Sequence, residues 1–335
     1  MEKTERAFSA GLLEWYAKNK RKLPWRDSSD PYKVWVSEAL LQQTRVEQAK
    51  PYYSKFLQKF PTVSALADAP LDNVLKEWEG LGYYARARNL HSAARKIQEE
   101  HGSKIPADEK TLSQLPGFGP YTTNAVLSLA FNKDLAVTDG NVARILARVF
   151  LLEEDVRTTQ GRLKIQALAQ ELLPPGKARD WNQALMDLGS LVCTPRTAAC
   201  TECPLEKVCE AHRTGAEESY PRKKKQKTRP VRKAVALLAK RGENVLFVQR
   251  PAKGFLGGLW SLPQLENGST REFAKEFGLK SGKKLGSVRH EYSHFTLELE
   301  VYGADGQPKV GKWARPEEVA LDGATKRALE LVAKS

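Results

Sequence analysis

The hydrophobic residues in the first two thirds of the chain recur three and four positions apart. The pattern runs through AFSAGLLEWYA, YKVWVSEALLQQ, NAVLSLAF, VARILARVF and IQALAQELL, with glycine and proline between the segments. This spacing is typical of amphipathic helices, and no strong two-residue alternation competes with it. We therefore predict an all-α region of about ten helices from residue 2 to about residue 210.

The period changes in the last third of the chain. KAVALLAKRGENVLFVQR predicts a strand, a glycine-containing turn and a second strand, and HFTLELEVYG carries an apolar residue at every second position. TREFAKEFG and TKRALELVAK have helical spacing instead. We expect a smaller α+β domain over residues 231–335, joined to the helical region by a linker over residues 211–230.

The charge of the chain is uneven. Its 335 residues carry a net charge of +14, but residues 1–210 contain 29 Lys+Arg and 26 Asp+Glu. Residues 211–230 contain 7 Lys+Arg and 2 Asp+Glu, and residues 231–335 contain 18 Lys+Arg and 12 Asp+Glu. This excess is compatible with an acidic polymer as partner, although basic charge alone fits many soluble proteins. The run PRKKKQKTRP is either a solvated spacer or a strap that contacts phosphates.

The sequence also bears on the compartment. No window reaches the roughly 18–20 apolar residues of a membrane span, and the N-terminus lacks the layout of a signal peptide. We therefore expect no membrane association and a reducing compartment, the cytoplasm, where disulfides are rare.

All four cysteines fall within the segment CTPRTAACTECPLEKVC, with the spacing C-x6-C-x2-C-x5-C. Apolar cores scatter their cysteines, whereas four thiolates on one short loop can surround a single metal centre. The spacing leaves a structural zinc ion and an iron–sulfur cluster equally open. The candidate ligands are Cys193, Cys200, Cys203 and Cys209.

Two carboxylates stand in contrasting settings. Glu38 lies in VWVSEALLQQT, where Val34 and Leu41 flank it on the same helical face. Apolar neighbours raise the pKa of a carboxyl group and make it a usable general acid. Asp139 precedes the apolar helix NVARILARVF at the N-cap position, where backbone N–H groups favour the anion.

Each carboxylate alone is more commonly an idle surface or capping residue. Together, one carboxyl that stays protonated and one that stays ionised suit the cleavage of a glycosidic bond. The sequence spacing does not show that the two meet in space.

Several strings in this order carry a family resemblance: LPWR, YKVWVSEALLQQTRVEQ, GLGYYARARNLH, LPGFGPYT, DGNVAR, the cysteine pattern and GFLGGLWSLP. The chain resembles, over almost its whole length, the MutY family of adenine DNA glycosylases in the helix-hairpin-helix superfamily that includes endonuclease III. The resemblance implies a monomeric DNA repair enzyme that is associated with the nucleoid. It would excise adenine mispaired with 8-oxoguanine or guanine in double-stranded DNA and leave an abasic site.

The resemblance also implies a multidomain architecture. An all-α helix-hairpin-helix glycosylase domain would span residues 1–210. Within it, residues 28–136 would form a helical barrel, and residues 1–27 with 137–210 an iron–sulfur lobe. The cysteine loop would carry a [4Fe–4S] cluster, with Arg196 near phosphate, and residues 231–335 would form a Nudix-like domain that recognises 8-oxoguanine.

The family's catalytic motif carries over onto individual residues. Glu38 would protonate adenine at N7, and Asp139, across the cleft, would stabilise the sugar cation. Asn141 would help to hold the site, and Arg26 would contact the flipped base. Tyr121 occupies the position at which lyases of the superfamily hold their lysine, so a Schiff base is not expected.

The expected DNA contacts are spread along the chain. Gln43 and Thr44, with Tyr83 as a stacking wedge, would lie in a helix near the 8-oxoguanine. Gly117 and Gly119 would let the hairpin backbone approach a phosphate. The family's recognition loop matches the residues Tyr292, Ser293 and His294.

Four further positions bear on these expectations. Only Glu272 and Glu276 stand where Nudix hydrolases hold a dense acidic metal box, which argues against nucleotide hydrolysis. His290 is expected to be a surface histidine. Asn124 stands where many MutY-like chains have glycine, a departure that the sequence does not explain.

Three other functions compete with this assignment. A bifunctional endonuclease III-like glycosylase and lyase needs an amine nucleophile, which position 121 lacks. A cluster protein that only recruits partners to DNA has no need of both Glu38 and Asp139. A zinc-dependent regulator would lack the visible absorption of an iron–sulfur centre.

Overall fold

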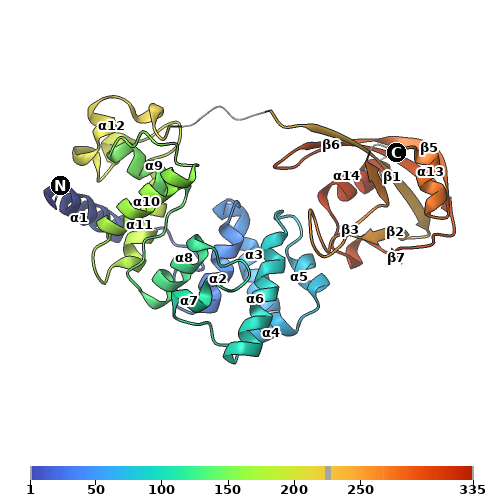
Figure 1. Cartoon of the computed structure of the whole chain (residues 1–335), viewed down its shortest axis with the longest axis horizontal. Coiled ribbons are helices and arrows are strands. Elements are labelled where there is room, and N and C mark those ends of the chain that lie inside the picture. The colour runs from blue at the N-terminus through green and yellow to red at the C-terminus, as the bar shows by residue number, and fades with distance from the viewer. Residues whose placement is uncertain (1, 223–227, 267, 334–335) are drawn as a thin grey trace. The chain divides into compact units, whose positions relative to one another are not determined.

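The computed structural model describes residues 2–222, 228–266 and 268–333, so residues 223–227, half of the basic run PRKKKQKTRP, lie outside the described residues. Contacts divide the chain into two compact units, residues 1–64 with 92–225 and residues 65–91 with 226–335. Helices make up the described residues up to Arg213 apart from their connecting turns, and a sheet follows after Arg229 (Figure 1).

The helices begin and end largely where the sequence pattern indicates. Two short ones, α4 and α7, bring the number of α-helices before Cys193 to eleven, against about ten expected. They have six and four residues, which is too short for a 3.6-residue period to be visible. The helices are α1 (Glu2–Asn19), α2 (Pro31–Leu41), α3 (Val46–Lys59), α4 (Val63–Asp68), α5 (Leu71–Glu77), α6 (Ala85–His101), α7 (Glu109–Leu112), α8 (Pro120–Phe131), α9 (Gly140–Val149), α10 (Thr159–Leu172), α11 (Ala178–Leu191) and α12 (Glu210–Arg213).

One apolar core joins the N-terminal helix to the helices around the cysteines. Phe8 and Leu12 of α1 are fully buried together with Ile145 of α9 and Trp181 of α11. Leu205, from the cysteine segment itself, belongs to the same core. Residues from both ends of the helical region therefore form a single lobe.

The helix-hairpin-helix turn lies between α7 and α8. Leu115 and Phe118 are buried and anchor the turn to the protein interior, whereas Gly117 and Gly119 are exposed. Gly117 has a φ of 82°, a backbone conformation that glycine adopts without strain. Gly119 is the N-cap of α8, with Pro120 at the first helical position, so the free N–H groups of α8 face outward at this turn.

The C-terminal part confirms the expected change of period. A seven-stranded mixed sheet has the order β3-β2-β1-β6-β5, with β4 paired to β1 and β7 paired to β2. The β1–β6 pairing is parallel and the other pairings are antiparallel. The strands are β1 (Val231–Arg241), β2 (Asn244–Gln249), β3 (Trp260–Ser261), β4 (Gln264–Glu266), β5 (Leu279–Glu291), β6 (Thr296–Gly306) and β7 (Lys312–Ala314).

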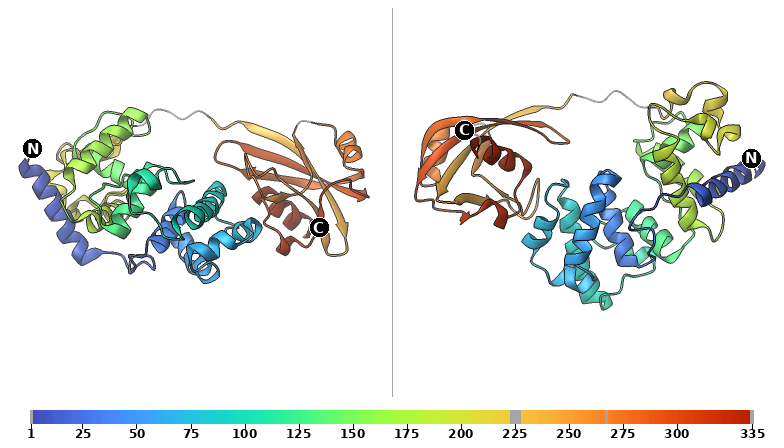
Figure 2. Two further views of the ribbon diagram at one scale, coloured as in Figure 1. Left: turned by 60° about the horizontal axis from the view of Figure 1, so that its bottom comes forward. Right: turned by 180° about the vertical axis from the view of Figure 1, so that it is seen from behind.

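Alternation along β1 separates two apolar layers. Ala236 and Leu238 point into a core that contains Ala324 and Ala328 of α14 (Gly323–Ala333). Leu237 and its alternate neighbours point into a second core, which contains residues of α13 (Thr270–Glu276). Each face of the sheet is thus covered by one helix (Figure 2). The four alternating apolar positions are all buried as expected: Phe295, Leu297, Leu299 and Val301.

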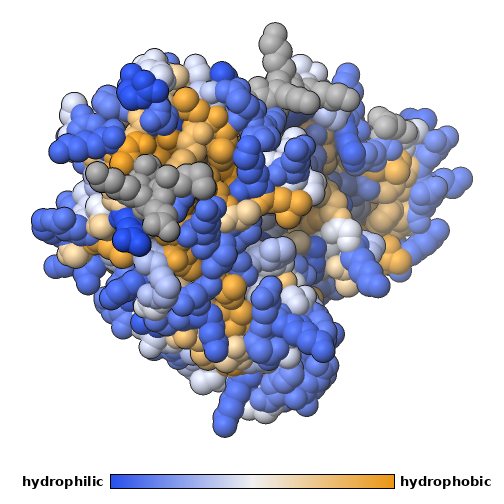
Figure 3. Space-filling view, turned by 60° about the vertical axis from the view of Figure 1, so that its left-hand side comes forward, coloured by the Kyte–Doolittle hydropathy of each residue, from blue (hydrophilic) through white to orange (hydrophobic). Residues whose placement is uncertain are grey.

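Polar and apolar side chains share the face of the molecule that Figure 3 draws. Figure 3 shows one face, on which hydrophilic side chains surround separate apolar patches. Among the described residues, no helix is both long and apolar enough to cross a membrane.

Candidate active site and cysteine centre

A cavity of about 180 Å³ lies among helices of the first unit. Glu38 from α2, Tyr121 from α8 and Asp139 from the start of α9 all line it, and Asn141 and Arg26 line it as well. The structure therefore brings together the two carboxylates that the sequence could only place apart, and all the residues expected to be catalytic share one cavity.

Glu38 occupies the middle of α2 and is 4% exposed. Asp30 caps this helix by accepting a hydrogen bond from the Tyr32 N–H, and Pro31 starts it, so the register that turns Glu38 inward is fixed locally. Burial raises the pKa of Glu38 to about 7, against an opposing hydrogen bond from Tyr121. The carboxyl is thus protonated over much of the range near neutral pH, as the sequence predicted.

Tyr121 contacts Glu38 directly. Its hydroxyl donates a hydrogen bond of 2.8 Å to Oε2 of Glu38. Burial raises the pKa of Tyr121 well above its ordinary range, so the phenol remains a donor. This contact was not foreseen from the sequence, which identified Tyr121 only by the lysine it lacks.

Asp139 is the N-cap of α9, as expected, and its carboxylate is held by three N–H donors. Oδ1 accepts from the backbone N–H groups of Asn141 and Val142, each at 2.8 Å, and Oδ2 accepts from Nδ2 of Asn141 at 2.9 Å. The carboxylate thus lies at the positive end of the α9 dipole, and both of its oxygens are hydrogen-bonded. Arg144 in turn donates to Oδ1 of Asn141 at 2.8 Å, which orients the amide.

A buried ion pair holds the Arg26 side chain at the cavity. Its guanidinium forms a bidentate ion pair with Asp187 of α11, whose side chain is fully buried. Arg21 donates to the same carboxylate. Sequence reasoning missed Asp187, although a single acid within the apolar helix NQALMDLGSL is unusual enough to attract attention.

The helix expected around Gln43, Thr44 and Tyr83 is wrong. Gln43 and Thr44 lie in the turn between α2 and α3, and Tyr83 precedes α6. Gln43 and Tyr83 have φ angles of 60° and 49°, which turns adopt and right-handed helices do not. Thr44 lines the cavity, and the Tyr83 ring is 43% exposed.

The four cysteines line one further cavity, whose walls include Ile145, Val149 and Leu188. All four thiols are free and partly buried. Burial raises the pKa of Cys200 to about 11 and that of Cys203 to about 12, so the thiolates that a metal needs depend on the charge of the metal itself. Four convergent sulfurs in an apolar pocket fit a thiolate-bound metal centre.

Buried arginines surround this centre on the helical side. Arg148 donates to Sγ of Cys193 at 3.3 Å and to the Thr194 carbonyl at 2.8 Å. Arg144 donates to the Cys193 carbonyl at 2.8 Å. Both arginines belong to VARILARVF, where the spacing predicts the polar face of an ordinary helix. The sequence therefore did not reveal that they donate hydrogen bonds around Cys193. Arg196 is exposed on the cysteine loop.

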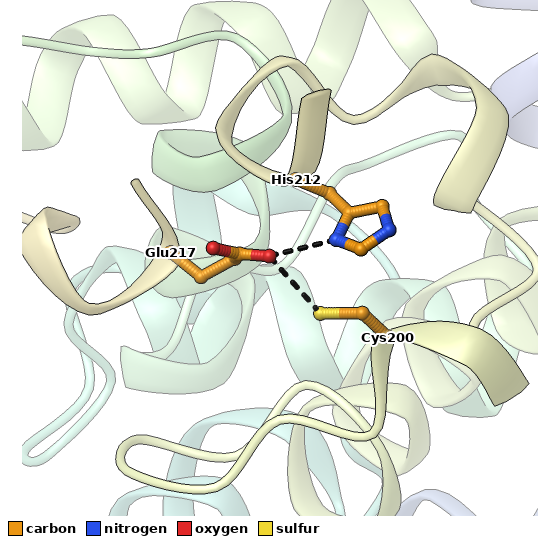
Figure 4. A group of neighbouring side chains, drawn as sticks. All are labelled: Cys200, His212 and Glu217. Atoms are coloured by element: carbon orange, nitrogen blue, oxygen red, sulfur yellow. Dashed lines mark hydrogen bonds and ion pairs between the residues drawn. The ribbon is translucent and has the colours of Figure 1, made fainter. Parts of the chain in front are cut away.

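Two further polar residues flank Cys200 (Figure 4). Oε1 of Glu217 lies 2.7 Å from Nδ1 of His212 and 3.6 Å from Sγ of Cys200. The carboxylate thus bridges the imidazole and the thiol. A histidine three positions after the last cysteine was the available clue, and sequence reasoning did not use it.

The expected recognition loop is a turn between β5 and β6. Ser293 and His294 are exposed, whereas Tyr292 is half-buried and packs against Phe255 and Phe295, with ring centroids 4.9 and 5.0 Å apart. The tyrosine therefore supports the turn from inside the domain. Glu272 and Glu276 are exposed on α13.

His290 is not the surface histidine that was expected. It is half-buried, its ring centroid lies 4.4 Å from that of Tyr292, and its Nδ1 is shielded from solvent. Burial lowers its pKa, which keeps the imidazole neutral beneath the turn.

Comparison with known proteins places these features in a family. A model described as "HhH-GPD superfamily base excision DNA repair protein" matches residues 36–175, and a "NUDIX domain" model matches residues 234–331. The solved structure of a thermostable thymine-DNA glycosylase is similar, with a TM-score of 0.59 and 31% identity. It covers 64% of this chain and 98% of that one.

Similarity to curated proteins extends over both parts of the chain. The adenine DNA glycosylase of Homo sapiens is 35% identical over 93% of this chain and 71% of its own length. That of Buchnera aphidicola subsp. Schizaphis graminum is 36% identical over 87% of this chain and 86% of its own. With Glu38, Tyr121 and Asp139 on one cavity and a cysteine centre beside α9, the chain belongs to the adenine DNA glycosylase family.

Proposed function

We propose that this protein excises adenine paired with 8-oxoguanine or guanine in double-stranded DNA, by acid-assisted hydrolysis of the N-glycosidic bond. The observation that carries the proposal is the single cavity lined by a carboxyl group with a raised pKa and by a second carboxylate that accepts three N–H hydrogen bonds. A base must leave the duplex to reach such a cavity, at a cost of roughly a few kcal/mol.

Glu38 is the general acid of this proposal. A pKa of about 7 leaves a large fraction of the carboxyl protonated at neutral pH, and adenine becomes a better leaving group once N7 accepts that proton. Arg26, held in place by Asp187, contacts the flipped base from the same cavity.

Asp139 stabilises the positive charge that develops on the sugar as the bond breaks. Its Oδ1 accepts from the backbone N–H groups of Asn141 and Val142, and the Asn141 side chain fixes its Oδ2. Acid and anion thus come from different elements, α2 and the N-terminus of α9, so that each keeps its own environment.

Tyr121 makes the reaction a simple base excision. A phenol has no amine nitrogen and so cannot form the imine on which a lyase depends, and the Tyr121 hydroxyl donates to Glu38 instead. The product is an abasic site in an unbroken strand.

The DNA contacts follow from exposed backbone and side chains. The N-terminus of α8, with Gly117 and Gly119 in front of it, accepts a backbone phosphate. Gln43, Thr44 and Tyr83 contact the mispair itself, with Tyr83 inserted into the stack. We propose that the protein acts as a monomer.

The turn at Ser293 and His294 recognises 8-oxoguanine in this proposal. Both side chains are exposed, and Tyr292 and His290 support them from within the sheet domain. Since α13 presents only two separated glutamates, the domain recognises the base and does not hydrolyse nucleotides.

The cysteine centre holds a [4Fe–4S] cluster in this proposal. Cys193, Cys200, Cys203 and Cys209 would be its ligands, and the bound cluster would crosslink the loop that bears Arg196. Thiolate ligation and free cysteines point to a reducing compartment, which we propose to be the cytoplasm.

The proposed reaction is tested with a duplex that contains adenine opposite 8-oxoguanine. The wild-type chain should release adenine, and strand breaks should appear only after alkali. Glu38→Gln should abolish release, because the amide has no proton to give. The exposed Glu47→Gln is the matched control and should retain the wild-type rate. Absence of adenine release, or strand breaks without alkali, would contradict the proposal.

The pH dependence of adenine release should report Glu38. Activity requires the protonated acid, so the single-turnover rate should be lost as the pH rises through about 7. Tyr121→Phe removes a hydrogen bond that stabilises the carboxylate, which raises the pKa of Glu38 further. The basic limb of the pH–rate profile should therefore move to higher pH in Tyr121→Phe. A limb that stays in place or moves to lower pH would exclude Glu38 as the acid.

Recognition of 8-oxoguanine should be lost selectively in the turn variants. Ser293→Ala and His294→Ala should each lower the rate ratio between 8-oxoguanine:A and G:A duplexes by about five- to tenfold, the effect of one lost hydrogen bond. Lys280→Ala, exposed on β5, is the control. An equal loss on both duplexes would assign the turn to general DNA binding instead.

The metal content separates the two kinds of thiolate centre. The purified protein should be brown and contain about four iron and four sulfide per chain. Cys200→Ser should lower the iron content, whereas Arg196→Ala on the same loop should retain it, because its side chain is exposed. Stoichiometric zinc without sulfide would refute the cluster.

A further inference from the structure

The segment that leads into Asp139 has no neighbouring strand to pair with. Residues 132–139 connect α8 to α9 and belong to no helix or strand. Ala136 and Val137 are nevertheless fully buried. Their peptide groups therefore need hydrogen-bond partners within the protein.

Amide side chains supply those partners on one edge of the segment. Asn182 of α11 is fully buried, and its Oδ1 accepts from the Val137 N–H at 2.9 Å. Its Nδ2 donates to the Leu135 carbonyl at 2.9 Å. One side chain thus binds the N–H and the C=O of alternate residues, as the edge of a neighbouring strand does.

The opposite edge is bound in the same way from α10. Oε1 of Gln170 accepts from the Ala136 N–H at 2.9 Å, and its Nε2 donates to the Asp134 carbonyl at 2.9 Å. Gln166 donates to the Ala136 carbonyl at 2.9 Å and accepts from the Thr138 hydroxyl at 2.7 Å.

A third helix completes this set. Nδ2 of Asn124, on α8, donates to the Ala136 carbonyl at 3.0 Å. The Ala136 carbonyl therefore accepts hydrogen bonds from two amide side chains, those of Asn124 and Gln166. This contact accounts for the asparagine at a position where the sequence suggested glycine. We define the amide clamp as the side chains Asn124, Gln166, Gln170 and Asn182.

We propose that the amide clamp positions Asp139 for catalysis, an inference that rests on the role proposed above for Asp139. The backbone of Asp139 directly follows the clamped residues, and its side chain already bonds to the first turn of α9. The clamp therefore sets where the N-terminus of α9, and with it the carboxylate, lies in the cavity.

The chemistry of the clamp suits this task. An amide both donates and accepts, so one side chain satisfies both kinds of backbone group. It also carries no charge, so the clamp holds the chain beside Asp139 without altering the charge balance of the cavity. The clamp residues act through Asp139 and are positioning residues.

The test compares Asn182→Ala and Gln166→Ala with Ser9→Ala in the full-length protein. Ser9 is a buried residue of the same lobe that donates to the Leu172 carbonyl and accepts from Trp181 Nε1, without touching residues 134–138. Three quantities are measured: the single-turnover rate of adenine release from saturated duplex, the Kd for DNA, and the Tm.

Asn182→Ala should lower the single-turnover rate by about 10²-fold, as expected for a misplaced catalytic group, and Gln166→Ala should lower it less. The Kd for DNA should not change. Ser9→Ala should lower the Tm to a similar extent and leave the rate unchanged. The proposal would be overturned if the rate fell in proportion to the Tm in all three variants, Ser9→Ala included.

Combination with Asp139→Asn separates positioning from other roles. If the clamp acts through Asp139, adding Asn182→Ala to Asp139→Asn should cause no further loss. The same fold loss in both backgrounds would overturn the proposal. If Asn182→Ala does not fold, Asn124→Ala combined with Gln166→Ala takes its place, since both side chains are partly exposed.

The outcomes distinguish this inference from the proposed function. A wild-type protein that does not release adenine, or an Asp139→Asn variant with full activity, contradicts the function and with it the premise of the clamp. An active wild-type protein with a severely impaired Asp139→Asn variant and fully active clamp variants contradicts the clamp alone.

Discussion

One cavity holds a buried carboxyl group with a raised pKa and a second carboxylate bound by backbone N–H groups, and the surrounding architecture keeps these two environments apart. Two carboxylates that share an identical environment raise each other's pKa, and neither role is then secure. Here the difference comes from secondary structure. Glu38 lies in the interior of α2, away from the helix start, whereas Asp139 accepts hydrogen bonds from N–H groups in the first turn of α9.

The cavity walls depend on buried charges that add little to stability. Asp187 is fully buried, and Arg21 and Arg26 both form ion pairs with its carboxylate. Burying such a pair costs about as much desolvation energy as the attraction returns, while removal of one partner costs about 3–5 kcal/mol. The arrangement is therefore better understood as a means of fixing Arg26 at the cavity than as a source of folding energy.

Features with a local cause were predictable from the sequence. The environment of Glu38, the capping role of Asp139, the strands after Val231 and the grouping of the cysteines all follow from neighbours within about ten positions. The partners that complete the site do not. Asp187 meets Arg26 across 161 positions, and Tyr121 meets Glu38 across 83, and no single-sequence pattern encodes such distances.

The helix expected at Gln43 and Tyr83 failed for a different reason. Both residues have positive φ angles without being glycine, so composition gives no warning of the turn. His290 was misjudged because alternation along β5 is weak, and a half-buried histidine looks like an exposed one in such a strand.

The connection into Asp139 shows how tertiary structure replaces a missing sheet. A helical lobe offers no free strand edge. The backbone N–H and C=O groups of an irregular buried segment must therefore form hydrogen bonds with side chains of the surrounding helices. Asn124, Gln166 and Asn182 come from three different helices, α8, α10 and α11. The position of the carboxylate is therefore tied to the packing of all three. A local opening of any one of them removes bonds from this segment, whereas Glu38 on α2 keeps its helix. The two carboxylates of the cavity thus differ in how far their positions depend on long-range packing, with Asp139 the more dependent of the two.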